Sequence, residues 1–440
     1  MSRGVIDIKL ILGEEHVVVR GIRPEEKLWG PYQFPLPYRL DDRILVSVHV
    51  EEDTIVTSGN PTRWFESFDE GNAWQETDPK NAAQCGLMLP NGDRLYFPVV
   101  GGINLKDYQF PDYSMLTPDY DFSKQAEEGH MPIQDGVTAW WTSDVIRAYK
   151  AERLPPSLCK KEWIADRIPA GQTEPVREKV PVDWPYLTRV VFNRPDGNMM
   201  KPINPRGMAK LGPDGNIYVS AFSGEGHLNP ENGWYCPYYS AEIFRSDDLG
   251  HSFYRLAHME YEADGKQYPY QSGGFSDSDF AFMSDGSIVW FLRSAWMGST
   301  GLEWAPMYWS RSTDGGKTWT KPEIFAQTGI LPRLCQLDCG VTLLCYARPG
   351  IFVQACPTND PQTWTEPLTV MTPDDRSGLA NIKIEKPSFH EWDGGCNNPE
   401  LLPLGENRAL LFYSDFYYPD ESGVKRKTIL CREIRVEDID

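Results

Sequence analysis

A turn-forming pattern that recurs along the chain is the feature that most limits how the chain can fold. The skeleton Ser-x-Asp-x-Gly-x-x-aromatic occurs at 67–74, at 312–319 and, with Phe253 as its aromatic residue, at 246–253. Ser and Asp oxygens accept hydrogen bonds from backbone N–H groups in tight turns, and Gly readily adopts a positive φ. The pattern therefore predicts a structural turn with an inward-packed aromatic ring, rather than a catalytic motif.

A second pattern, an apolar run followed by a turn and another apolar run, occurs in six longer segments. The dipeptides Asn-Gly at 91–92 and Asp-Gly at 214–215 and 285–286 are strong signals for two-residue hairpin turns. After most of these hairpins come a further strand, a Ser-Asp-Gly turn and another strand, so each unit is predicted to contain four antiparallel strands. The six segments are 33–50, 83–100, 206–222, 277–293, 332–348 and 398–414.

Six four-stranded units in one chain are typical of a β-propeller, whose ring closure leaves few open edges. The last unit is one strand short, and the N-terminal segment 4–12 is predicted to complete it. Residues 103–190 are predicted to form an insertion in the second unit, over the active-site face, with one short helix within 138–154. The sequence thus predicts an all-β fold, a single six-bladed propeller over 1–440.

The composition argues against several classes of partner. The formal net charge is -20, which disfavours nucleic acid and anionic membrane surfaces. No apolar run is long enough to span a membrane, and the N-terminus lacks a signal-peptide pattern. The nine cysteines contain no CxxC pair and the seven histidines no HxH or HExxH spacing. We therefore expect a cytoplasmic protein with reduced thiols, no metal and no organic cofactor.

The propeller geometry selects candidate site residues. In such a ring the first strand of each unit lines the central channel, so the start of that strand and the end of the next strand share one rim. Several arginines on one rim favour bidentate binding of a carboxylate, as in a sialic or uronic acid; single arginines could alternatively form structural salt bridges. The selected residues are Gln33, His49, Glu52, Arg206, Asp277, Arg293, Arg333, Arg348, Asn398 and Tyr413.

The Ser-Asp-Gly turns resemble the Asp-boxes, or BNR repeats, of the sialidase superfamily, and six units are similar to its six-bladed propeller. The resemblance implies that Asp277 and Arg293 take the places of an acidic residue and a carboxylate-binding arginine of the fourth unit, and Arg348 that of a further arginine. Gln-Phe-Pro at 33–35 stands where the family has Arg-Ile-Pro, and Asn-Asn at 397–398 where its nucleophilic tyrosine is expected. The resemblance therefore implies a divergent member and not a standard sialidase.

Three functions follow from these residues, each with an oligosaccharide or glycoside as partner. A glycoside hydrolase for an acidic glycan would use Asp277 and Glu52, or the adjacent Glu51 or Asp53, as its two carboxylates. A lyase would use His49 as base or acid at a uronic acid whose carboxylate the arginines neutralise. A non-catalytic glycan-binding propeller is the third. The hydrolase is the favoured interpretation, because carboxylates are predicted on the same rim as the arginines.

Overall fold

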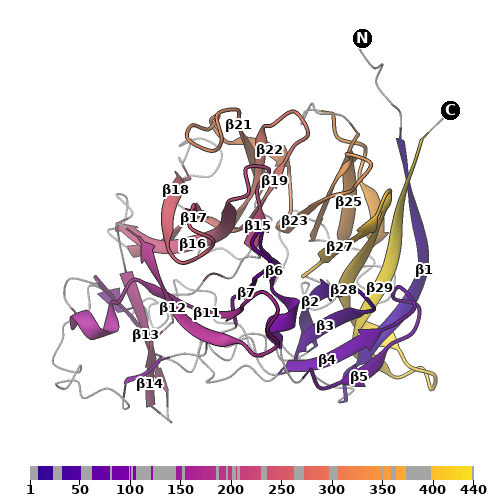
Figure 1. Ribbon diagram of the computed structural model, residues 1–440, viewed down its shortest axis with the longest axis horizontal. Helices are drawn as coiled ribbons and strands as arrows, with labels where there is room; N and C mark the ends of the chain where they lie inside the picture. Colours follow the sequence, from indigo (N-terminus) through magenta and orange to yellow (C-terminus); the bar gives the residue numbers. More distant parts are fainter. Residues whose placement is uncertain are drawn as a thin grey trace.

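The computed structural model is almost entirely β-strand where it describes the chain (Figure 1). Short 3-10 helices lie at Ala82–Cys85 and Pro156–Leu158. The all-β class predicted from the repeated hairpin segments is therefore confirmed. The described residues are 8–22, 32–50, 62–79, 82–98, 100, 103–105, 120–121, 145–150, 154–184, 188–194, 197–200, 205, 209–228, 235–261, 272–296, 306–347, 350–357, 363–372 and 398–438.

Within these ranges, the strands can be followed along the chain in six successive sets of four, called groups here. The second, third and fourth groups are joined by short parallel pairings into one 12-stranded sheet. The first contains β2 (Gln33–Arg39), β3 (Ile44–His49), β4 (Thr62–Ser67) and β5 (Gln75–Thr77). The second contains β6 (Leu87–Met88), β7 (Arg94–Tyr96), β11 (Glu162–Ile168) and β12 (Val176–Asp183). The third contains β15 (Ala209–Leu211), β16 (Ile217–Leu228), β17 (Tyr235–Ser246) and β18 (Phe253–Met259).

The remaining three groups follow in chain order. The fourth contains β19 (Ser272–Phe282), β20 (Ile288–Trp296), β21 (Met307–Ser312) and β22 (Glu323–Ala326). The fifth contains β23 (Ile330–Gln336), β24 (Thr342–Ala347), β25 (Ile351–Cys356) and β26 (Leu368–Met371). The sixth contains β27 (Glu400–Gly405), β28 (Arg408–Pro419), β29 (Lys425–Asp438) and β1 (Ile8–Arg20).

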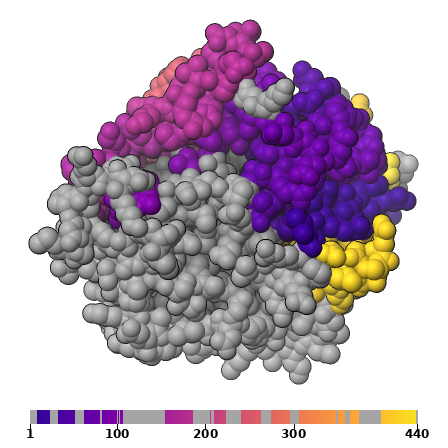
Figure 2. Space-filling model, turned by 90° about the horizontal axis from the view of Figure 1, so that it is seen from below, coloured from indigo at the N-terminus to yellow at the C-terminus, as the bar shows by residue number. Residues whose placement is uncertain are grey.

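The two ends of the chain meet in the sixth group. Strand β1 pairs antiparallel with β29, from Ile8 opposite Asp438 to Arg20 opposite Thr428. In Figure 1 the two strands run side by side. Figure 2 shows indigo N-terminal residues next to yellow C-terminal ones on the surface. The N-terminal strand thus covers what would otherwise be the open edge of β29.

The first strands of several neighbouring groups lie side by side. The first strand of one group contacts the first strand of the next, β2 with β27, β27 with β23, β23 with β19, and β15 with β6. Apolar side chains fill the space between groups, because successive residues of a strand point to opposite faces. In β28, Leu411 packs with Val353 of the fifth group, whereas Phe412 packs with Val46 of the first.

The region predicted as an insertion differs from the expectation in two ways. Strands β11 and β12 lie inside 103–190, yet β11 pairs with β7 and completes the second group. The predicted helix is wrong at Val145–Lys150, which is strand β10 and pairs antiparallel with β13 (Thr188–Arg194). A β-branched pair at its start and a long partner strand favour extended pairing over a short helix. The other strands of this separate sheet are β8 (Ile103–Asn104), β9 (Tyr120–Asp121) and β14 (Gly197–Met200).

The Ser-Asp-Gly turns are held by side-chain hydrogen bonds. Ser312 Oγ donates to Asp314 Oδ1 at 2.8 Å and accepts the Gly316 N–H at 2.8 Å. Asp314 Oδ1 accepts the Thr318 N–H at 2.9 Å, and the Trp319 indole N–H donates to the Gly316 carbonyl at 2.9 Å. The same Ser and Asp contacts recur at 67–73 and 246–252. These side chains therefore stabilise turns.

Replacing Asp314 by asparagine should flatten the acid limb of the stability curve. Hydrogen bonds from the Thr318 hydroxyl and N–H lower the pKa of the Asp314 carboxyl from 3.8 to about 2. A carboxyl with a lowered folded-state pKa stabilises the fold above its unfolded pKa and loses that contribution as the pH falls through the folded one. Between pH 3.8 and about 2, the wild-type free energy of unfolding should therefore fall more steeply than that of Asp314→Asn. Urea unfolding at several pH values measures this, and parallel acid limbs would contradict it.

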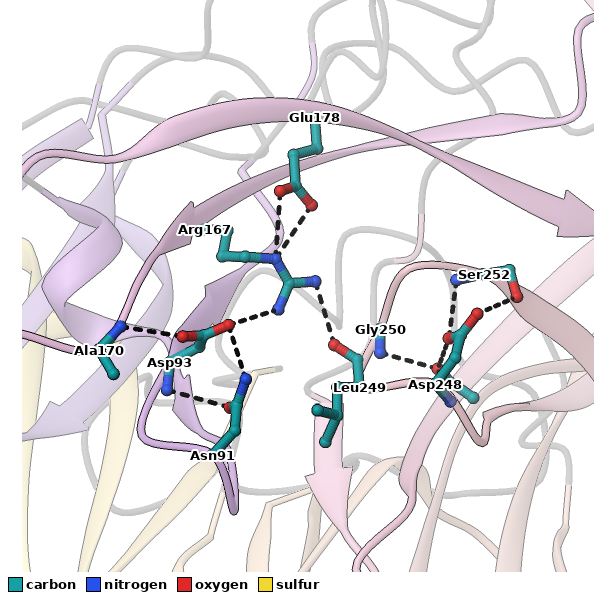
Figure 3. Close-up of polar contacts among 10 residues, drawn as sticks. Asn91, Asp93, Arg167, Ala170, Glu178, Asp248, Leu249, Gly250 and Ser252 are labelled. Atoms are coloured by element: carbon teal, nitrogen blue, oxygen red, sulfur yellow. Dashed lines mark hydrogen bonds and ion pairs between the residues drawn. The ribbon is translucent and has the colours of Figure 1, made fainter. Parts of the chain in front are cut away.

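A buried arginine joins the second group to the third (Figure 3). The Arg167 side chain is 4% exposed, and its Nη1 lies 3.3 Å from Asp93 Oδ2 while its Nε lies 3.1 Å from Glu178 Oε2. Its Nη2 donates to the Leu249 carbonyl, in the turn at 246–253, at 3.0 Å. Arg167 therefore fixes a turn of the third group to two carboxylates of the second.

Candidate functional site

The structure describes most of the predicted site residues, but not all of them. Glu52, Arg206 and Arg348 lie outside the described residues. The others are on strands of the first, fourth, fifth and sixth groups, or immediately before one. They are Gln33 on β2, His49 on β3, Asp277 on β19, Arg293 on β20, Arg333 on β23, Asn398 before β27 and Tyr413 on β28.

An irregularity interrupts three first strands, near the beginning of β2 and β23 and in the middle of β19. Phe34, Asp277 and Leu331 have positive φ angles of 53°, 32° and 50°, and the ladder register shifts at each of them. Residues other than glycine are strained there by roughly 1–3 kcal/mol, and such strain is concentrated at functional sites. Pro35 and Pro332 follow two of these residues, which fits a bulge because proline offers no N–H to the ladder.

Asp277 and Arg293 form an ion pair across the fourth group. Arg293 Nη1 donates to Asp277 Oδ2, and the two side chains are 23% and 21% exposed, respectively. Arg293 Nε is buried and has no hydrogen-bond partner in the described part of the chain. The pair is therefore partly accessible to a ligand.

Arg333 and Glu400 form a second pair, between the fifth and sixth groups. Arg333 Nε lies 2.5 Å from Glu400 Oε1, and its Nη1 donates to the Pro332 carbonyl at 3.0 Å. Burial raises the pKa of the Glu400 carboxyl, although the Arg333 charge opposes this rise. Burial lowers the pKa of Arg333, but the negative charges of Glu400, Asp279 and Asp277 together outweigh it, so the pKa is raised. Arg333 therefore lies within electrostatic reach of carboxylates from two groups.

A third pair, between Lys210 and Asp279, holds three first strands together. Lys210 Nζ on β15 lies 2.7 Å from Asp279 Oδ1 on β19, and it donates to the Phe280 carbonyl at 2.6 Å and the Leu334 carbonyl at 3.1 Å. Asp279 Oδ2 also accepts the Leu334 N–H at 2.8 Å. Because Leu334 follows Arg333 in β23, this network fixes the backbone that carries Arg333.

The other predicted residues differ in their placement. His49 is buried opposite Gln33 in the ladder, with its ring edge-on to Phe34 at 6.0 Å between centroids. Asn398 is buried, and its Oδ1 has no hydrogen-bond partner among the residues the structure describes. The Tyr413 hydroxyl donates to Glu15 Oε2 of β1 at 2.7 Å, so this side chain points to the outer strands and away from Arg333.

Three residues of these ion pairs, Lys210, Asp279 and Glu400, were not selected from the sequence. Glu400 had a local signal, since it follows Asn398-Pro399 just as Arg333 follows Leu331-Pro332. A charged residue directly after proline at the start of an apolar first strand is the shared feature. Lys210 had no such signal, because its partners Asp279 and Leu334 lie far along the chain.

Other chemistries find little support in the part of the chain that the structure describes. No group of three or more His, Cys, Asp or Glu side chains there is placed to hold a metal ion. Burial raises the pKa of the Cys335 thiol to about 12, so this thiol is protonated near neutral pH and is a poor nucleophile. No described helix is long and apolar enough to cross a membrane.

Comparisons with known proteins show a fold but no family. No family model matches the chain, and neither does any curated protein. A protein of unknown function from Dyadobacter fermentans is 16% identical, covers 97% of this chain and 99% of its own, and has a TM-score of 0.58. This likeness shows a shared fold.

Sialidases are also among the similar solved structures. A mutant of NanB sialidase from Streptococcus pneumoniae is 11% identical over 95% of this chain and 70% of its own, with a TM-score of 0.44. Trypanosoma rangeli sialidase in complex with the inhibitor DANA is 9% identical over 92% of this chain and 55% of its own, with a TM-score of 0.39. Both TM-scores are too low to establish more than a distant likeness.

Proposed function

We propose that the chain is a glycoside hydrolase for an acidic glycan, built on a single six-bladed β-propeller. The six successive four-strand groups, with contacts between the first strands of several neighbouring groups, support the propeller. The observation that carries the hydrolase is the meeting of carboxylates and guanidiniums from three groups, in the pairs Asp277–Arg293 and Arg333–Glu400. Paired carboxylates are the usual acid and base of glycoside hydrolysis.

The arginines of this centre are suited to an acidic sugar. A guanidinium has five N–H donors, and Arg293 uses Nη1 for Asp277 while its buried Nε has no partner in the described ranges. Arg333 uses Nε and Nη1, and it retains Nη2 as far as the described residues go. A substrate carboxylate can accept the remaining donors in the bidentate geometry that favours arginine over lysine. Arg206 and Arg348 remain further candidates for this role.

Asp277 is the carboxylate that we assign to the chemistry. It is partly exposed and next to Arg293, so it can approach the sugar while its negative charge is balanced. A carboxylate so placed can accept the proton of an attacking water or stabilise positive charge on the sugar ring. Glu52 is the second carboxylate that the sequence suggests.

A uronate lyase is the second candidate, and it rests on His49. His49 is opposite Gln33 in the first group as Arg293 is opposite Ser276 in the fourth, so the two occupy equivalent places beside their bulges. An imidazole at that place could remove or deliver the proton beside a uronic carboxylate. The product distinguishes the two reactions, because only a lyase leaves an unsaturated uronate.

Arg293→Lys should weaken the binding of acidic sugars by roughly 10–100-fold, since hydrogen bonds to charged groups contribute about 1.5–3 kcal/mol. Lysine keeps the charge but cannot reproduce the planar fork. Isothermal titration calorimetry with glucuronic acid and N-acetylneuraminic acid measures the change. Arg63→Lys is the matched control, because Arg63 pairs with Glu76 on the outer strands of the first group. Equal affinities for both acids in wild type and Arg293→Lys would remove the acidic-substrate proposal.

A further inference from the structure

Glu400 has one carboxylate oxygen in an ion pair and one without any partner. Its side chain is 5% exposed, and Oε1 is bound by Arg333 Nε at 2.5 Å. Oε2 is buried and makes no hydrogen bond to any residue that the structure describes. Leaving a buried polar atom unsatisfied costs about 1–3 kcal/mol, so each such atom calls for an explanation. A ligand atom that reaches Oε2 in the working enzyme is such an explanation.

A second, independent observation on Asn398, two residues before Glu400, supports the same explanation. Its Oδ1 is also buried and also without a partner in the described ranges. Two unsatisfied acceptors at the start of β27 match a ligand that carries several hydroxyl groups. A sugar ring offers such groups, whereas a carboxylate offers no donors.

The charges that face Glu400 come from three other groups, two of them positive and one negative. They are Arg333 on β23, Asp279 on β19 and Lys210 on β15. Burial is the largest influence and raises the pKa of Glu400, and Asp279 raises it further, while Arg333 and Lys210 lower it. Asp277 differs, because it is partly exposed and bound by Arg293. Two carboxyls in such different environments are suited to opposite roles as acid and base.

We propose that Glu400 is the proton donor of the hydrolysis, with Asn398 as acceptor for a sugar hydroxyl; the proposal rests on the glycosidase function above. The bond from the anomeric carbon to the leaving oxygen breaks, and its electron pair stays on that oxygen, which takes the proton from Glu400 Oε2. Water adds to the anomeric carbon, and its proton goes to Asp277. Exchange with solvent then returns both carboxyls to their starting states.

The test compares leaving groups that need a proton to depart with leaving groups that do not. Glu400→Gln should lower the hydrolysis rate of methyl glycosides at least ~100-fold, the low end for a general acid. Dinitrophenyl glycosides leave without a proton, so their rate should fall less than ~10-fold. Glycosides of glucuronic acid and N-acetylneuraminic acid are the substrates. In wild type the methyl-glycoside rate should also fall as the pH rises through the pKa of Glu400, and this alkaline limb should disappear in the variant.

Glu242→Gln is the matched control for a buried, arginine-paired glutamate. Glu242 is fully buried on β17, and Arg255 Nη1 lies 3.2 Å from its Oε1. Any loss of hydrolysis rate in Glu242→Gln should be the same for methyl and dinitrophenyl glycosides, whatever the melting temperature of the variant. Equal losses of Glu400→Gln on both leaving groups would overturn the proposal, and so would a selective loss in Glu52→Gln instead. A wild type that hydrolyses none of the glycosides would overturn the glycosidase function itself.

Discussion

Asp277→Asn should lower kcat at least ~100-fold, the low end for a group that moves a proton, while the fold is retained. Asparagine keeps the shape of the side chain but can neither accept the proton of water nor balance a positive sugar ring. Turnover of a substrate that wild type hydrolyses, together with the far-UV circular dichroism spectrum, measures both parts of this expectation.

A control separates catalysis from the loss of an ion pair. Asp166 accepts from Arg177 Nε at 2.8 Å on β11 and β12, away from the first strands. Asp166→Asn should therefore turn over like wild type. If Asp277→Asn also keeps near-wild-type turnover and only loses affinity, Asp277 merely anchors Arg293, and His49 becomes the stronger candidate.

Arg167→Met should lower the free energy of unfolding by about 3–5 kcal/mol, the typical cost of removing one partner from a buried ion pair. Methionine fills similar space but leaves Asp93, Glu178 and the Leu249 carbonyl without the guanidinium. The hydrogen bond from Arg167 to the turn of the third group is lost at the same time. Chemical denaturation measures the difference.

The neighbouring surface pair is the control for that experiment. Arg177 is largely exposed and pairs with Asp166 on the same two strands. Arg177→Met should cost about 0–1 kcal/mol, as is usual for exposed pairs. Equal costs in the two variants would show that burial of Arg167 contributes nothing to its role.

The strand pattern could be predicted because its signals are local. Hairpin dipeptides such as Asp214-Gly215 and the turn at 312–319 determine their own geometry within a few residues. Strand β10 was predicted as a helix, because its apolar spacing alone does not decide between the two structures. Pairing with β13, about forty residues away, decides for the strand.

The ion pairs of the candidate site were harder to predict, because they join segments that are distant in the sequence. Arg333 and Glu400 are 67 residues apart, and Lys210 and Asp279 are 69 apart, so no local pattern connects them. Ring geometry selected Asp277, Arg293 and Arg333, which lie within β19, β20 and β23 and take part in the two ion pairs. It could not show that the Tyr413 ring turns to the outer strands, since that depends on packing.

Product analysis of the wild-type protein with uronate- and sialate-terminated oligosaccharides tests the central claim most directly. We expect new reducing ends without any unsaturated uronate, and we expect Asp277→Asn to abolish them. Formation of an unsaturated uronate, a product that incorporates no water, would contradict hydrolysis and favour the lyase with His49. Binding of these oligosaccharides with no product at all would contradict both reactions and leave a glycan-binding propeller.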